Sequence, residues 1–448
     1  MSMMKFAPFY LVFQSFSLAI HPIVRSLQSE LNLFYLDDGI IGGSPETVLS
    51  DIQILLEESA KIGLEINPRK CELFFPSGND YNIIQQRFED LLPGVHLVSS
   101  ENLSLLGAPL VHEGYEKKVE DKLTKMKNIF EKLKDIPAHF ALHLMKNCLG
   151  IPKLLYILRT VPTWKGIDIL NRMDLTLKST LEDLLNVKLN EKEWKQANLP
   201  IRHGGLGIRS IIDLSLPAFL ASCSCVKVNV SNMLNTSVDK LTLPHEMEAM
   251  DLWNSKFDAV PVEFPNFQKK WDDICVRKKV SEMKFDNAVN TARFLALQEK
   301  ESNVWLQVIP CKSIGTFLED NVLRISICLR LGCDVCQKFK CRCGKEMDTK
   351  GLHALSCSKS AGRFYRHAEL NNIIKRALTS IEIPSMLEPS GLSRDDGKRP
   401  DGVTIVPWER GQHIVWDSTC VDTFAESYLS TTKETAGAAA EIKATCLI

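Results

Sequence analysis

The sequence predicts an α+β protein with several domains, and three observations support this prediction. The chain has 448 residues, which is enough for several domains of about 100–200 residues each. Short apolar runs around acidic or glycine-rich turns predict paired strands near residues 31–43, 103–111 and 399–423. Residues 140–330 show mostly helical periodicity, with breaks at proline.

Composition limits the class of protein. A hydrophobic content of 45% and a charged content of 24% are typical of a globular protein. The net charge of -1 gives no overall positive field, so contact with nucleic acid would depend on local basic stripes. Cysteines crowd between Cys328 and Cys357, and such crowding favours a metal site over disulfides. We therefore expect an intracellular protein, nuclear or cytoplasmic, that is not secreted.

The apolar segment at residues 6–20 has some features of a signal peptide or a membrane span. It is shorter than the about 20 residues that a span requires, and it contains Gln14, Ser15 and Ser17. No small-residue cleavage pattern follows it. We predict a buried helix here and no membrane association.

Apolar spacing predicts two helices in the first third of the chain, at residues 46–62 and 116–134. Lysines lie on the other faces of the second helix, and solvation explains them more simply than contact with nucleic acid. Farther on, residues 199–210 (LPIRHGGLGIRS) combine glycines with arginines, a weak indication of a loop that approaches phosphate. The apolar stripe of the second helix consists of Val119, Leu123, Met126, Phe130 and Leu133.

The first candidate site is Asp37 and Asp38, at the tip of the predicted hairpin over residues 31–43. Burying two adjacent carboxylates without a cation is costly, and a divalent ion would remove that cost. The alternative is a solvated Asp-Asp-Gly turn, which spacing alone favours.

The surroundings of this turn resemble the end of a reverse-transcriptase palm. FYLDDG is followed by an amphipathic helix, then by GLEINPRKCELFF at residues 63–75 and LSLLGAPL at residues 103–110. The resemblance implies that Asp37 and Asp38 hold Mg²⁺ or Mn²⁺, and that Lys70 is the strand lysine near the nucleic acid. It also implies that the pair at residues 103–111 is the grip hairpin.

The chain departs from that family in one respect. The family supplies another metal-binding aspartate and a glycine-containing loop from upstream, whereas this chain has no aspartate before Asp37 and no glycine before Gly39. We expect that the fingers and half of the palm are missing and that the chain does not polymerise by itself. Whether a partner chain completes the palm stays open.

The second candidate site is a zinc knuckle in CDVCQKFKCRCGKEMDTKGLHALSC, residues 333–357. Zinc prefers four nitrogen and sulfur ligands in a tetrahedron. Gly344 suits a knuckle turn, because glycine permits positive φ. The alternative is a set of buried or free cysteines. The predicted ligands are Cys341, Cys343, His353 and Cys357, with Cys336 as a substitute for Cys341.

The third candidate site is a pair of aspartates across a predicted hairpin. Residues 403–406 and 413–419 are predicted strands, and residues 409–411 supply the turn. Asp401 and Asp417 are an even number of positions apart, which puts both on one face within about 8 Å. They could hold one divalent ion, and two exposed edge aspartates are an equally good explanation.

The C-terminal region, from the cysteines through RPDG and WDST, resembles non-LTR retrotransposons that carry a restriction-like endonuclease. The resemblance implies that Asp401 and Asp417 are catalytic ligands of Mg²⁺ or Mn²⁺. The family lysine does not follow Asp417 directly, so Lys433 or Lys443 would serve. The helix at residues 362–378 carries candidates for contact with the DNA backbone, for which ordinary solvation is equally good: Arg363, Arg366 and His367.

Together these resemblances imply a retroelement protein with RNA-directed DNA polymerase ancestry, DNA and RNA as partners, and metal-dependent DNA nicking. The alternatives are a non-enzymatic nucleic-acid-binding remnant and a chain that does not fold stably, since half a palm leaves unpaired strand edges. The expected division is a partial palm (1–113), thumb-like helices (114–200), a helical connection (201–330), a zinc knuckle (331–360) and a C-terminally incomplete α/β endonuclease-type module (361–448).

Overall fold

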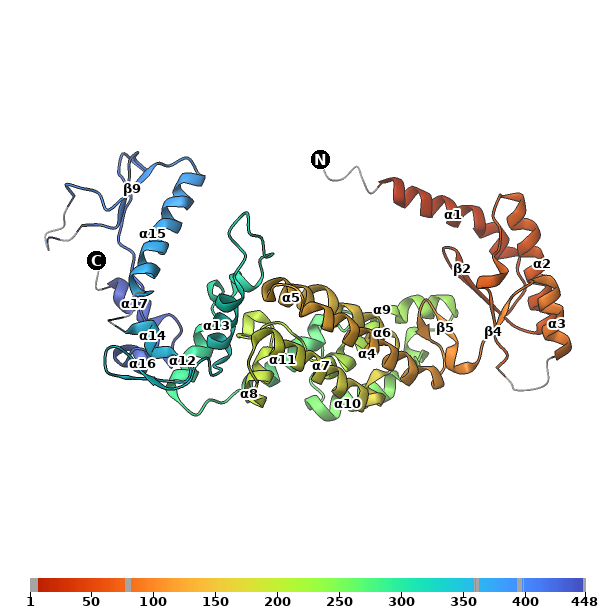
Figure 1. Ribbon diagram of the computed structural model, residues 1–448. Helices are drawn as coiled ribbons and strands as arrows, with labels where there is room; N and C mark the ends of the chain where they lie inside the picture. Colours follow the sequence, from red (N-terminus) through yellow and green to blue (C-terminus); the bar gives the residue numbers. More distant parts are fainter. Residues whose placement is uncertain are drawn as a thin grey trace. The chain divides into compact units, whose positions relative to one another are not determined.

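The computed structural model describes residues 7–76, 82–357, 359, 362–392, 397 and 399–445, with side chains from residue 14 onward except at 363, 364 and 445 (Figure 1). It is 57% helical and 8% strand, so the α+β class is confirmed. The chain divides into two compact units, Met1–Asp121 and Lys122–Ile448. Each unit is described separately.

The first unit combines helices with three pairs of short strands. The predicted hairpin is confirmed: Tyr35 pairs with Asp38, and Leu36 and Asp37 form the turn. The helix predicted at residues 46–62 is present and begins at Pro45. The Ser44 side chain caps it by accepting a hydrogen bond from the Thr47 N–H. In chain order the elements are α1 (Ala7–Ser26), β1 (Leu31–Tyr35), β2 (Asp38–Gly42), α2 (Pro45–Lys61), η1 (Pro68–Lys70), β3 (Glu72–Leu73), α3 (Asn82–Leu91), β4 (His96–Leu97), η2 (Ser100–Asn102), β5 (Ser104–Leu105) and β6 (Ala108–Pro109).

Helix α1 corrects one expectation. The apolar segment is helical, as predicted, but its described side chains are largely exposed, and Leu18 is 74% exposed. Only Ile23 and Leu27, at the end of the helix and just beyond it, are buried, in a small core with Leu55 of α2. The prediction of a buried helix was therefore wrong for residues 14–20, the part of the predicted segment whose side chains the structure describes.

The strand pair around Gly107 is also confirmed, with two residues in each strand. Leu106 and Gly107 form its turn with φ of 49° and 83°. β3 pairs with β4 in parallel, a connection that the sequence did not predict.

Helix α4 (Glu113–Leu133) crosses from the first unit into the second. All five residues of its predicted apolar stripe are buried, and Leu123 is completely inaccessible. The stripe recurs at helical spacing, which places its members on one face of the helix. The amphipathic helix is therefore confirmed.

The helical part of the second unit is built around α9 (Ile211–Met233), which contacts α6, α7, α10 and α11. Trp253 of α10 and Trp271 of α11 are fully buried against its apolar side chains. The described helices here are α5 (Ala138–Leu144), α6 (Ile151–Thr160), α7 (Ile167–Leu185), α8 (Glu191–Ala197), α10 (Glu246–Phe257), α11 (Gln268–Glu282), α12 (Ala288–Ala296) and α13 (Asp320–Leu331), joined by the shorter turns η3 (Met145–Leu149), η4 (Thr163–Gly166), η5 (Ile201–His203), η6 (Val238–Lys240) and η7 (Glu301–Leu306).

Among the described helices, α9 alone has the length and apolar composition of a membrane span. Its apolar window is 56% buried inside the protein. That burial is typical of the central helix of a folded domain.

The glycine-rich loop at residues 199–210 is fixed by internal contacts. Arg202 and Arg209 form ion pairs with Asp273 and Asp272 of α11. From α13, the buried guanidinium of Arg330 donates to backbone carbonyls of this loop. The loop arginines are therefore paired with carboxylates, and contact of this loop with phosphate stays a prediction.

In the C-terminal part of the second unit, the strands that the structure describes are all short (Figure 1). The predicted hairpin is present, but its strands are shorter than expected, and the sheet has a third strand that the sequence did not predict. The last described element is a helix, Ala438–Thr445. The elements are β7 (Phe339–Lys340), β8 (Glu346–Met347), α14 (Leu352–Ser356), α15 (Gly362–Ser380), β9 (Ser385–Leu387), β10 (Gly402–Thr404), β11 (Val415–Trp416), α16 (Glu426–Thr432) and α17 (Ala438–Thr445).

Candidate metal centre

The turn between β7 and β8 places two cysteines on one tight loop. The N–H of Cys341 donates to the carbonyl of Lys345, and the N–H of Gly344 donates to the carbonyl of Cys341. Gly344 has φ of 93°, a conformation that glycine adopts without strain. Cys343 lies in the middle of this turn, so both thiols are presented by the same few residues.

Helix α14 supplies the other two side chains. Asp348 fixes the start of the helix, because its carboxylate accepts hydrogen bonds from the N–H groups of Leu352 and His353. Cys357 follows the last turn, and its N–H donates to the carbonyl of His353. His353 and Cys357 therefore lie one turn apart on the same side of a short helix.

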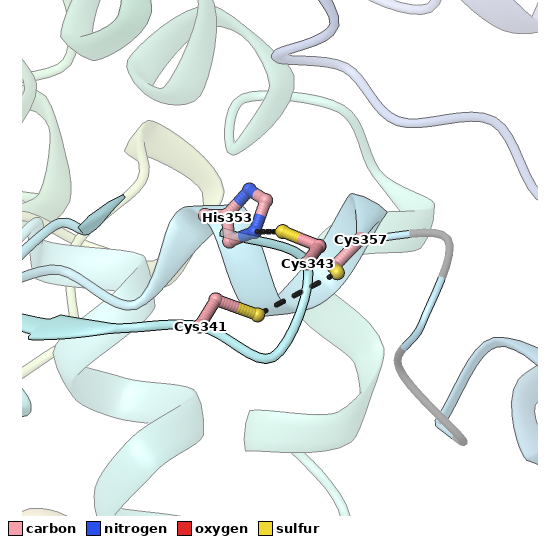
Figure 2. A group of neighbouring side chains, drawn as sticks. All are labelled: Cys341, Cys343, His353 and Cys357. Atoms are coloured by element: carbon pink, nitrogen blue, oxygen red, sulfur yellow. Dashed lines mark hydrogen bonds between the residues drawn. The ribbon is translucent and has the colours of Figure 1, made fainter. Parts of the chain in front are cut away.

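These four side chains converge, as Figure 2 shows. The ligand atoms of Cys341, Cys343, His353 and Cys357 all lie within 4.8 Å of one another. The two thiols of Cys341 and Cys357 are 3.7 Å apart, and the Cys343 thiol is 3.1 Å from Nε2 of His353. A tetrahedral zinc with Zn–S bonds of about 2.3 Å has sulfur atoms about 3.8 Å apart. The group could therefore hold a zinc ion with little movement.

The protonation of the thiols also suits a metal. The backbone N–H of Lys345, helped by His353, lowers the pKa of Cys343 to about 6. The backbone N–H of Lys359 lowers the pKa of Cys357, but burial and the neighbouring thiols raise it by more. The pKa of Cys357 is therefore raised overall. Since the thiolate is the form that binds zinc, Cys343 is ready to bind near neutral pH, whereas Cys357 has to release a proton.

Cys336, the substitute considered from the sequence, lies outside this group. Its thiol donates to the backbone carbonyls of Asp348 and Thr349, at 3.3 Å and 3.6 Å. The four-residue set preferred from the sequence is thus the set that the structure brings together.

The two aspartates of the first hairpin are not part of a comparable group. Asp37 lies in the turn and Asp38 begins β2, and both are exposed. Among the described residues, the Cys₃His group is the only cluster of three or more Cys, His, Asp or Glu side chains close enough for one ion. Lys70 is exposed and ends the η1 turn, so it precedes β3 and does not lie within that strand.

The aspartates of the C-terminal hairpin face each other across the strands. Gly402 pairs with Trp416, which places Asp401 opposite Asp417 at the end of the pair. The carboxylate of Asp401 accepts a hydrogen bond of 2.6 Å from the N–H of Ser418. The side chain of Asp401 is 16% exposed, whereas Asp417 is exposed to solvent.

Helix α15 supports this hairpin through two side chains. Nε2 of His367 lies 3.0 Å from the Asp401 carboxylate. Asn371, one turn farther along, is buried and accepts hydrogen bonds from Trp416 Nε1 and the Ser418 hydroxyl. Sequence reasoning missed Asn371, and its only signal was its spacing of four from His367 on one helix face.

The other predicted residues have varied surroundings. The side chain of Arg363 lies outside the described residues, and the guanidinium of Arg366 donates to the carbonyl of Leu355 in α14. Lys433 is exposed at the end of α16, and within the described part of the chain its ammonium forms no hydrogen bond or ion pair with Asp401 or Asp417. Lys443 lies on α17. The role of Lys433 or Lys443 beside Asp401 and Asp417 stays a prediction.

No protein-family model matches the chain, and no curated protein is similar enough to count as a match. Proposals about its function therefore depend on the residues and their geometry.

Proposed function

We propose that this protein derives from a retroelement reverse transcriptase and that its remaining chemistry is metal-dependent nicking of DNA by the C-terminal module. The observation that carries the proposal is the Cys₃His group, which directly precedes α15, the helix that contacts Asp401. The sequence resemblance gives the order of the zinc knuckle, helix α15 and the β10–β11 hairpin with Asp401 and Asp417, which we call the acidic hairpin. The geometry adds that helix α15 contacts both the knuckle and the hairpin.

Zinc would have a structural role here. Four protein ligands fill a tetrahedral site and leave no position for water or substrate, as is usual for structural zinc. When bound, the ion would cross-link the β7–β8 turn, through Cys341 and Cys343, to α14, through His353 and Cys357.

Asp401 and Asp417 would supply the nicking chemistry. Carboxylate oxygens suit Mg²⁺ or Mn²⁺, and a bound ion of this kind activates water and stabilises charge on a phosphate. The Ser418 N–H and His367 both engage Oδ2 of Asp401, which fixes the orientation of the carboxylate and directs Oδ1 elsewhere. Asp417 would complete the pair from the facing strand.

Asp37 and Asp38 mark ancestry in this proposal and not activity. Both are exposed at a hairpin tip, and no third potential ligand among the described residues joins them in a metal-binding group. Two-metal phosphoryl transfer needs a larger set of carboxylates to hold its ions.

Nicking of supercoiled plasmid by the full chain, with Mg²⁺ or Mn²⁺, tests the proposal. We expect Asp401→Ala and Asp417→Ala each to reduce the nicking rate about 100-fold or more, since each removes a ligand of the ion. Glu409→Ala is the matched control, because Glu409 is an exposed acidic residue in the same hairpin. Nicking that survives Asp401→Ala, or its absence from the zinc-loaded wild type, would overturn the proposal.

A second candidate is a zinc-stabilised nucleic-acid-binding protein without catalytic activity. The observation that favours it is that Asp401 and Asp417 belong to no group of three potential ligands within the described chain. Zinc-dependent binding of DNA or RNA that Asp401→Ala leaves unchanged, together with no nicking by the wild type, would establish this candidate.

A further inference from the structure

Two neighbouring residues of α15 reach in different directions. The guanidinium of Arg366 donates to the backbone carbonyl of Leu355 in α14. Leu355 lies between His353 and Cys357, two of the four residues of the Cys₃His group. Arg366 therefore connects α15 to the helix that supplies half of that group.

His367, the next residue, connects α15 to the acidic hairpin. Its Nε2 lies 3.0 Å from Asp401 Oδ2 and 3.1 Å from the carbonyl of Ser418. Both of these atoms are acceptors, so Nε2 carries the proton that is shared between them. The other ring nitrogen lies 3.5 Å from the side-chain amide of Asn371, which can donate to it. The ring therefore has a partner on each nitrogen.

The elements at both ends of this connection are too short to be stable alone. Helix α14 has five residues, far fewer than the about 12–15 that an isolated helix needs. The β10–β11 pair has only two paired positions, and an isolated hairpin is marginal at best. Each element therefore depends on its attachments, and zinc is the strongest attachment available to α14.

We propose that Arg366 and His367 are positioning residues that link the zinc knuckle to Asp401, so that zinc binding orders the acidic hairpin. Zinc holds α14, α14 presents the Leu355 carbonyl to Arg366, and the fixed start of α15 holds His367 against Asp401. The inference rests on the zinc-binding part of the proposed function and is independent of nicking.

Hydrogen–deuterium exchange of the full chain, followed by mass spectrometry, tests the link. The reporter is the peptide at residues 412–420, which contains the Ser418 N–H that donates a hydrogen bond to the Asp401 carboxylate. We expect removal of zinc with a chelator to speed exchange of this amide about tenfold, the change that loss of one hydrogen bond to a charged group produces. Arg366→Ala should speed it equally while one zinc per chain remains bound.

Two further variants complete the design. Arg366→Lys retains a donor and should restore slow exchange. Arg376→Ala is the matched control, because Arg376 is an exposed arginine of α15 that pairs with Glu369 of the same helix. If zinc-loaded Arg366→Ala exchanges as slowly as the wild type, or if zinc removal leaves residues 412–420 unchanged, the link does not exist.

His367→Ala keeps the test decisive if Arg366→Ala loses zinc. This variant leaves the Arg366–Leu355 contact intact, so it should retain zinc and slow exchange at residues 346–357. Exchange at residues 412–420 should still be about tenfold faster, and slow exchange there overturns the proposal. The readout uses no DNA and no added Mg²⁺ or Mn²⁺, so a failure of nicking does not affect it.

Discussion

Replacing Cys343 by serine should weaken zinc binding far more than replacing Cys336, although both cysteines lie in the same short stretch. Cys343 belongs to the four-residue group, whereas the Cys336 thiol is hydrogen-bonded to backbone carbonyls outside it. Structural zinc sites have apparent binding free energies of about 10–16 kcal/mol, so an equal share for one of four ligands is roughly 2.5–4 kcal/mol. That share corresponds to an affinity about 100- to 1000-fold weaker.

The pKa values refine this expectation. At pH 7.5 Cys343, with a pKa of about 6, is already a thiolate, so its bond to zinc requires no deprotonation. Cys357, with a raised pKa, has to lose a proton before it binds. We therefore expect Cys343→Ser to cost more affinity than Cys357→Ser at this pH.

Competition with a chromogenic chelator at pH 7.5 measures these affinities, and Co²⁺ substitution reports the number of thiolate ligands. Cys343→Ser should reduce that number from three to two, and Cys336→Ser should leave it at three. If Cys336→Ser weakens binding as much as Cys343→Ser, the ligand set is wrong and so is the reasoning from geometry.

The remaining predictions concern pH, stability and polymerisation. Because protons compete with zinc for the Cys343 thiolate, acidification should weaken binding, and below about pH 6 the logarithm of the wild-type affinity should fall by about one additional unit per pH unit compared with Cys343→Ser; equal slopes in titrations would contradict this. Arg330→Met should lower the free energy of unfolding in denaturant by about 3 kcal/mol, because it leaves buried carbonyls of the 199–210 loop without a donor; unchanged stability would show that the loop relaxes. Burial raises the pKa of Asp174 above 3.8 in the folded protein, so folding favours the protonated carboxyl. This contribution to the free energy of unfolding is complete below pH 3.8 and is lost as pH rises through the raised pKa. Asp174→Asn should remove this part of the pH dependence of unfolding. Primer extension on an RNA template with Mg²⁺ should give no product. If the wild type does extend the primer and Asp37→Ala abolishes this, the partial palm is sufficient for polymerisation.

The Cys₃His group was predictable because its pattern is local. Cys341 and Cys343 share one turn, and His353 and Cys357 share one turn of helix, so spacing alone brings each pair together. The exclusion of Cys336 was not predictable, because its backbone partners, at Asp348 and Thr349, lie beyond β8. Only the folded chain decides between the two candidate thiols.

The turn of the C-terminal hairpin was predictable for a similar reason. Arg410 and Gly411 both have positive φ and form a two-residue turn between the bridged residues Glu409 and Gln412. The register of the strands does not follow from this turn, because the pairing shifts by three positions before Val403 pairs with Val415. The strand lengths and the support from Asn371 were not predictable. The sheet bonds of β10 end at Thr404, and the amide of Asn371 has no distinctive sequence pattern.

The failures come from long-range packing. The apolar pattern of α1 is genuine, but the small core at its end buries only Ile23 and Leu27. The arginines of the 199–210 loop gave a weak indication of a loop that approaches phosphate, and their ion pairs with Asp272 and Asp273 of α11 were not predicted. Neither partner is near in sequence, so periodicity and loop composition could not reveal them.

The distribution of buried apolar side chains indicates how much a bound zinc ion would contribute to the C-terminal module, whose strands have only two or three residues. The helical part of the second unit buries two tryptophans and many leucines. After Cys333, the buried apolar side chains of the described chain are few: Met347, Cys357, Pro389, Pro400, Ala438 and Ala439. Folded segments with so little core need another source of stability, such as a metal or a disulfide. Because the described cysteines form no disulfide, a zinc ion at the Cys₃His group would be such a source, and removal of zinc should unfold the module before the helices.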